Sequence, residues 1–283
     1  MRGDGFGSCF DEELVSSWLG ALERASSAWP HMSDNDPNFK KPPKKYHPKG
    51  ITFLYEDRDI LVVEKVSGLL TVSSEKVRED TAYFLLNNYV RKGNAKAPHR
   101  VFVVHRLDRD TSGVLVFAKS EQSKRFLQDN WSDFDKRYYA VVEGEPPKRE
   151  GMVTSYLREN SIKKMYSTTD KKKGKLSQTA YRVLKQGQGH SLLEITLLTG
   201  RKNQIRVHMA DLGCPVVGDR KYRPEGEENK PFKPGPPSGK GGRKRPRLAL
   251  YSASLSLVHP HSKKPLTFDS IIPPYFELLV RKS

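Results

Sequence analysis

Short runs of apolar residues, many of them β-branched, recur along most of the chain and indicate strands. Strands are predicted at residues 51–55, 60–63, 101–104, 114–118, 138–143, 192–198, 248–258 and 266–268. Helices are predicted at 83–90, from a Ser120 cap to about residue 130, and at 202–212, where Gly213 ends the helix. Because strands outnumber helices without regular alternation, we expect an α+β fold with a mostly antiparallel mixed sheet and flanking helices.

One polar segment precedes this pattern of strands and helices, and another interrupts it. Residues 1–49 are predicted to be an N-terminal extension, in which apolar residues at four-residue spacing favour a helix at 10–28 that packs on the main domain. Residues 33–49 are rich in proline and lysine and are interpreted as a basic linker. A compact domain at 50–283 follows, interrupted at 223–247 by a basic glycine- and proline-rich insertion, predicted to be flexible. That insertion is either a flap that contacts phosphates or a solvated surface loop.

Charge narrows the class of partner. The chain has 50 Lys and Arg against 33 Asp and Glu, a formal net charge of +17, which favours a polyanion: RNA, DNA or an anionic membrane surface. Its two cysteines, Cys9 and Cys214, are far apart and argue against a disulfide framework or a zinc site. No signal peptide or apolar run of membrane-spanning length is recognised, so a cytoplasmic protein is expected.

One polar segment contains the candidate catalytic residue. HRLDRDTSG at 105–113 lies between two predicted strands and presents Asp108 on a loop held by rigid elements. An Arg-x-Asp read by itself would be a salt-bridged turn. The whole string, however, resembles the HRLDxxTSG signature of the RluA-type pseudouridine synthases.

Further segments resemble the other motifs of that family, in the same order. They are LVVEKVSGLL at 61–70, KRYYAVVEG at 136–144, TGRKNQIRVH at 199–208 and PVVGD at 215–219. Together they extend the resemblance over about residues 51–280. Departures from the family pattern include Glu64, Val66, the pair Lys202-Asn203 and Cys214, and the small N-terminal RNA-binding domain of some members is not recognised. The resemblance therefore does not fix the substrate.

The resemblance implies that residues 50–283 form a catalytic domain that isomerises uridine in structured ribosomal or transfer RNA. It makes Asp108 the nucleophile or general base and Arg206 the cation that keeps it ionised by two-pronged pairing. Tyr138 would stack on the uracil once the base leaves its helix. Neither a cofactor nor a metal is expected, and a monomer without membrane contact is predicted.

Supporting residues are assigned by the same resemblance. Arg106 would fill the vacated space or clamp a phosphate, with a structural pairing as the alternative. Ile205 is interpreted as pocket wall or ordinary core. Lys65, Arg109 and Arg201 would bind RNA electrostatically or support the loop.

Two other functions compete with this reading. One is a catalytically idle RNA-binding or RNA-chaperone protein, which the intact set of Asp108, Tyr138 and Arg206 disfavours. The other is a metal-dependent nuclease, for which Asp108 and Asp110 alone are poor support.

His105 and His208 are predicted to be structural. The pair His259 and His261 shows no companion cluster, so no metal site is expected there.

Overall fold

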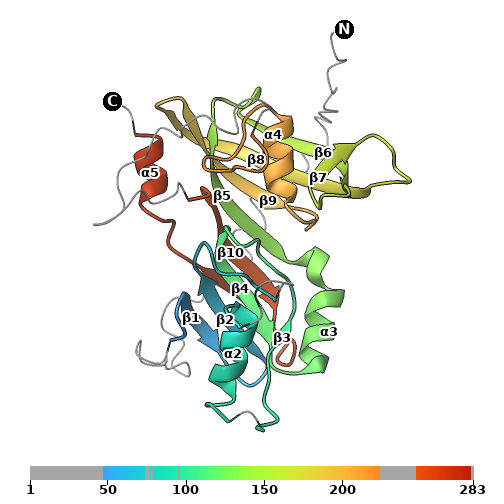
Figure 1. The fold of residues 1–283 in the computed structure, drawn as a ribbon, viewed down its shortest axis with the longest axis vertical. Helices are drawn as coiled ribbons and strands as arrows, with labels where there is room; N and C mark the ends of the chain where they lie inside the picture. The colour runs from blue at the N-terminus through green and yellow to red at the C-terminus, as the bar shows by residue number, and fades with distance from the viewer. Residues whose placement is uncertain (1–46, 74–76, 78, 95, 224–246, 282–283) are drawn as a thin grey trace. The chain divides into compact units, whose positions relative to one another are not determined.

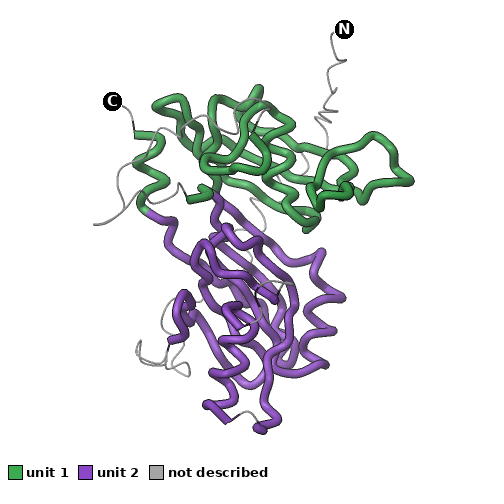
Figure 2. The backbone as a smooth tube through the Cα atoms, viewed as in Figure 1, with its two compact units in different colours: residues 1–28, 140–249, 274–283 green, residues 29–139, 250–273 purple. Residues whose placement is uncertain are grey.

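The computed structural model describes residues 47–73, 77, 79–94, 96–223 and 247–281. Within these, the chain divides into two compact units (Figure 2). Unit 1 contains residues 140–223, 247–249 and 274–281, and unit 2 contains the described residues from 47 to 139 and 250–273. The predicted helix at 10–28 and nearly all of the 223–247 insertion lie outside the described residues. The assignment of 50–283 to one catalytic domain stays a prediction.

Unit 2 is built on a sheet with the strand order β1-β2-β4-β10 (Figure 1). These strands are Ile51–Glu56, Ile60–Lys65, Ser112–Ala118 and Leu250–Val258. β11 (Pro265–Asp269) pairs with β10, and β3 (Phe102–Val103) pairs with β4. Among the pairings between these strands, only β4–β10 is parallel. All of these strands were predicted from the sequence, and their mixed, mostly antiparallel pairing confirms the predicted fold class.

The helices of unit 2 are α2 (Ala82–Val90) and α3 (Glu121–Asp129), followed by the 3₁₀ turn η2 (Trp131–Asp133). The Ser120 hydroxyl accepts a hydrogen bond from the Ser123 amide, so the predicted N-cap of α3 is confirmed. Leu127 of α3 packs into a core with β2, β4, β10 and β11.

A glycine fixes where the loop at 105–113 ends. Gly113, at the second position of β4, has φ +113°, and a Cβ there would lie 2.0 Å from the carbonyl oxygen of Ser252 on β10. Only glycine tolerates both conditions. The end of the HRLDRDTSG string is thereby held against the neighbouring strand.

Unit 1 is a second antiparallel sheet with the strand order β9-β8-β6-β7. β6 is Glu150–Glu159, β7 Met165–Thr168, β8 Lys175–Gly187 and β9 His190–Leu197. β5 (Asp135–Glu143) runs from unit 2 into unit 1. The helices are α4 (Gln204–Asp211), which packs against β7 and β8, and α5 (Tyr275–Leu279) (Figure 1). Of these elements, β5, β9 and α4 were predicted, whereas β6, β7, β8 and α5 were not.

Among the described helices, none has the length and apolar character required to cross a bilayer.

Candidate active site

Asp108 lies on the loop between β3 and β4, and the backbone on each side of it is anchored. The buried hydroxyl of Thr71 donates to the carbonyl of Leu107 at 2.8 Å and accepts from the Leu107 amide at 3.2 Å. The carbonyl of Arg109 accepts from the Gly68 amide at 2.9 Å. Asp108 itself is partly buried. Its carboxylate is therefore presented from a backbone that cannot shift without breaking these bonds.

A buried lysine adds a second bond to this anchor. Lys65, at the end of β2, is fully buried, and its ammonium group donates to the carbonyls of Val66, Leu69 and Arg109 at 3.1, 2.7 and 3.1 Å. Burial lowers the pKa of Lys65 to about 8, opposed by the negative charges of Asp110 and Asp108. These contacts support the loop-support role rather than contact with RNA.

Tyr138 lies on β5 in the same unit and is 8% exposed. Burial raises the pKa of its hydroxyl to about 12; the nearby Asp108 carboxylate adds to the rise, and a hydrogen bond with Ser252 opposes it. The hydroxyl therefore stays protonated at neutral pH, in the electric field of Asp108. Two of the three predicted catalytic residues thus belong to unit 2, where the charge of Asp108 acts on Tyr138.

Arg206 lies on α4 in unit 1, where it forms a two-pronged ion pair with Asp219. Its Nε donates to Oδ2 at 2.7 Å and its Nη2 donates to Oδ1 at 2.9 Å, and Arg206 and Asp219 are only 9% and 1% exposed. The Asp219 carboxylate also accepts from the amides of Lys221 and Tyr222. The predicted pairing of Arg206 with Asp108, which belongs to unit 2, stays a prediction.

The surroundings of this pair fix the helix that carries Arg206. The guanidinium carbon lies 5.1 Å from the ring centre of Tyr222, whose hydroxyl donates to the side chain of Asn203. Asn203 adopts the left-handed conformation just before α4. Asp219 and Tyr222 were not predicted as site residues; the PVVGD match contained Asp219 and could have indicated it.

Comparison with known proteins identifies the family. The model of the RNA pseudouridylate synthase family matches residues 59–211, slightly more than half of the chain. A ribosomal large subunit pseudouridine synthase D of Zymomonas mobilis is 32% identical over 240 residues, covering 82% of this chain and 72% of the relative. An uncharacterized RNA pseudouridine synthase of Synechocystis is 32% identical over 81% of this chain and 68% of its own length.

The chain belongs to the RNA pseudouridylate synthase family. The predicted RluA-type family and the predicted class of enzyme, an isomerase that acts on RNA, are confirmed.

Solved structures of the same family share the fold. Human RNA pseudouridylate synthase domain containing 4 superposes with a TM-score of 0.61 at 22% identity, covering 80% of this chain and 90% of that one. Human RNA pseudouridylate synthase domain containing 1 gives a TM-score of 0.59 at 23% identity over 85% and 89% of the two chains. The predicted pseudouridine synthase fold is thus confirmed.

The remaining predicted RNA-binding residues of this synthase differ in exposure. Arg106 and Arg109 are exposed on the loop at 105–113, and Arg109 pairs with Asp110 at 3.2 Å. Arg201 is exposed and donates to the carbonyl of Leu176, whereas Ile205 is 4% exposed within α4. The three arginines are accessible to RNA, and their roles stay predictions.

Two histidines that belong to the motifs of the synthase have structural surroundings. The His105 ring stacks on Trp131 and accepts from the Val116 amide, and burial lowers its pKa to about 3. His208 bridges the hydroxyls of Thr179 and Ser155, and burial lowers its pKa to about 4. Both are neutral at physiological pH and serve packing rather than proton transfer.

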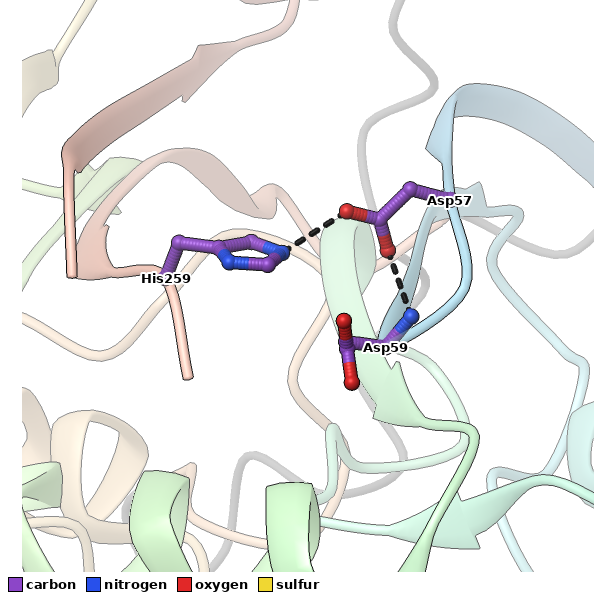
Figure 3. A group of neighbouring side chains, drawn as sticks. All are labelled: Asp57, Asp59 and His259. Carbon is purple, nitrogen blue, oxygen red and sulfur yellow. Dashed lines mark hydrogen bonds and ion pairs between the residues drawn. The ribbon is translucent and has the colours of Figure 1, made fainter. Parts of the chain in front are cut away.

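A third histidine has the acidic neighbours that the sequence did not reveal. Contrary to the expectation of no companion cluster, His259 lies beside Asp57 and Asp59 (Figure 3). His259 Nδ1 accepts from the amides of His261 and Ser262, so its proton is on Nε2, which donates to Asp57 at 2.7 Å. Neither nitrogen then offers a lone pair to a metal. This cluster joins the β1–β2 turn to the β10–β11 turn.

Proposed function

We propose that this synthase converts uridine to pseudouridine in large-subunit ribosomal RNA, with Asp108 as its catalytic carboxylate. One observation carries the assignment: Asp108 is partly buried, and the backbone on each side of it is hydrogen-bonded to residues 65–71. The choice of RNA is supported by the relatives from Zymomonas, Borreliella and Nitrosomonas that are named ribosomal large subunit pseudouridine synthase D.

The reaction requires a carboxylate that is held still and ionised. The bond from uracil nitrogen 1 to the ribose is broken, the base turns, and carbon 5 is bonded to the ribose instead. Carbon 5 loses a proton and nitrogen 1 gains one, so the balance involves no oxidation. An anionic Asp108 is suited to attack the nucleoside or remove a proton from it.

Arg206 and Tyr138 take the supporting roles in this proposal. Arg206 supplies the cation that favours the ionised form of Asp108, and its pairing with Asp219 fixes the plane of the guanidinium. The aromatic face of Tyr138 stacks on the extruded uracil, while its protonated hydroxyl donates a hydrogen bond near the reacting atoms. Extrusion is required because a paired uridine is out of reach inside its helix.

The test compares two carboxylates of the same loop. Pseudouridine is mapped in ribosomal and transfer RNA from cells that lack the gene and carry wild-type, Asp108→Asn or Asp110→Asn chains. We expect wild type and Asp110→Asn to restore large-subunit sites and Asp108→Asn to restore none. Activity in Asp108→Asn would contradict the proposed mechanism. Restored sites confined to transfer RNA would contradict the proposed substrate.

The same cells separate the enzyme from an idle RNA-binding protein. If no pseudouridine depends on the gene, yet Asp108→Asn rescues growth as well as wild type, the RNA-chaperone alternative is correct. A monomeric state and a cytoplasmic location remain part of the proposal, to be measured by sedimentation and by fractionation.

A further inference from the structure

The sheet of unit 1 has one face covered by α4 and an opposite face that carries exposed aromatic and apolar side chains. On the covered face, Leu157 and Met165 pack with Val207 of α4, and His208 bridges Ser155 and Thr179. Residues directly paired across antiparallel strands point to the same face, and neighbours along a strand point to opposite faces. The residues that alternate with these therefore form the other face.

The composition of this second face follows from the strand register. Arg158 pairs with Tyr166, and Tyr156 pairs with Thr168 on one side and Leu176 on the other. Tyr166 is 39% exposed, Leu176 is 41% exposed, and Arg158 is exposed. We name Tyr156, Arg158, Tyr166 and Leu176 the aromatic face.

A glycine packs closely against this face beside Tyr156. Gly174, just before β8, lies so close to β6 and β7 that a Cβ would be 2.6 Å from Cβ of Tyr156 and 2.9 Å from Cγ2 of Thr168. Any larger residue would press on these side chains or displace them. The glycine therefore allows the β7–β8 turn to pack closely against Tyr156, which stays partly exposed.

The segment that forms the aromatic face is also strongly basic. Residues 156–176 contain seven Lys or Arg and two acidic residues, an excess of five positive charges. Both acids are already paired with lysines: Asp170 with Lys173, and Glu159 with Lys202. The positive potential of the hairpins is therefore not cancelled by their own carboxylates.

We propose that the aromatic face binds unpaired nucleotides of the RNA substrate. Bases stack on Tyr166 and Tyr156, and phosphates are attracted by Arg158 and the hairpin lysines. The high lysine content favours RNA over a protein partner, because protein interfaces are depleted in lysine. This inference rests on the RNA-modifying function proposed above and adds a site for RNA that contains none of the predicted catalytic residues.

Binding is tested on the full chain carrying Asp108→Asn, so that turnover does not interfere. The probes are a fluorescein-labelled dodecamer of uridine and an abasic dodecamer with the same number of phosphates, measured by anisotropy. Stacking predicts that Tyr166→Ala weakens binding of the uridine dodecamer about tenfold. Binding of the abasic dodecamer should be unchanged, and Tyr166→Phe should retain most of the affinity.

The controls separate stacking from misfolding and from plain electrostatics. Tyr83→Ala removes a tyrosine of similar exposure, 36%, from α2 of unit 2, and should leave both affinities unchanged. Tyr166→Leu keeps an apolar residue suited to the strand and should still lose the uridine-specific affinity. Arg158→Gln should weaken both probes and reduce the salt dependence by about one released ion.

Equal effects of Tyr166→Ala on the two probes, or no effect on either, would overturn the proposal. So would a concentration-dependent dimer that Tyr166→Ala dissociates, since the face would then bind a second copy of the chain. These outcomes are independent of the catalytic proposal, because tritium release from uridine-labelled RNA by the wild-type chain tests the latter separately.

Discussion

Arg206 and Asp219 form a buried ion pair through two parallel hydrogen bonds, with their side chains 10% and 0% exposed. Removing one member of such a pair leaves the other charge buried without compensation, which costs about 3–5 kcal/mol. The pair therefore links the stability of unit 1 to the orientation of a proposed catalytic group.

Asp219→Asn should lower the free energy of unfolding by about 3 kcal/mol and reduce single-turnover pseudouridine formation at least tenfold. Urea unfolding and tritium release measure the two effects. Glu194→Gln is the matched control, because it breaks the more exposed Arg182–Glu194 pair in the same unit and should cost less than about 1 kcal/mol. Equal costs for the two variants would contradict the importance assigned to the buried pair.

Arg206→Lys should keep the positive charge but lose most of the activity, since an ammonium group cannot reproduce the planar two-pronged geometry. The measurement is the single-turnover rate at saturating RNA, with melting temperature followed in parallel. Full activity in this variant would show that charge alone is sufficient and that the guanidinium plane is unimportant.

Thr71→Val should reduce the chemical rate about tenfold, because the Leu107 backbone loses both bonds to the hydroxyl and Asp108 is positioned less accurately. Thr71→Ser keeps the hydroxyl and should retain most of the rate. Affinity for RNA, measured on each variant by anisotropy, should change little. A loss confined to affinity would mean that Thr71 acts on RNA binding and not on the position of Asp108.

Acid should destabilise the fold through His105 and His208. The folded-state pKa values of His105 and His208, about 3 and about 4, lie below the ordinary value of 6.5, so between these limits the unfolded chain binds more protons. Above about pH 6.5 both histidines are neutral in the folded and unfolded chain, and the free energy of unfolding is highest. It falls as the pH falls, by about 2 kcal/mol per histidine at pH 5. Urea unfolding at pH 7 and 5 should show this loss, and His208→Gln should reduce it. His261→Gln, at an exposed turn, is the control.

The cluster of Asp57, Asp59 and His259 should behave as a structural bridge without metal. Asp57 accepts from Tyr55, from two backbone amides and from His259, so Asp57→Ala should cost about 2–3 kcal/mol. Asp59→Asn leaves the turn intact and should cost much less. Added zinc or chelator should leave the melting temperature unchanged. A rise with zinc that Asp57→Ala abolishes would show that the cluster binds the ion.

Sequence patterns predicted the elements of unit 2 well because their apolar residues are nearly continuous. In β4 all residues from Gly113 to Ala118 are buried, and in β2 the run from Ile60 to Val63 is buried. The predicted cap of α3 and the end of α4 before Gly213 followed from single residues with strong local preferences.

Prediction failed where burial is irregular. β8 carries exposed Lys175 and Leu176 at its start, and a register shift between Val183 and Lys185 breaks the two-residue period that identifies a strand. β6 has polar and exposed residues in its second half, and β7 has only four residues. The aromatic face lies within this unpredicted part.

Contacts between side chains that are far apart in the sequence could not be predicted either. Nothing in the spacing of Arg206 and Asp219 shows that a helix and the turn after it bring them within hydrogen-bonding distance. The sequence also left Lys65 between RNA binding and loop support, because its burial against three carbonyls cannot be seen in a motif. Motif resemblance located these residues, and only coordinates show what each one contacts.

The Thr71 and Lys65 bonds to Leu107 and Arg109 have a dynamic consequence. Residues 65–71 cannot separate from the loop at 105–113 one bond at a time, so the two segments should open to solvent together as a single cooperative unit. Native-state hydrogen exchange at the amides of Leu107 and Gly68 should then proceed with the same free energy of opening.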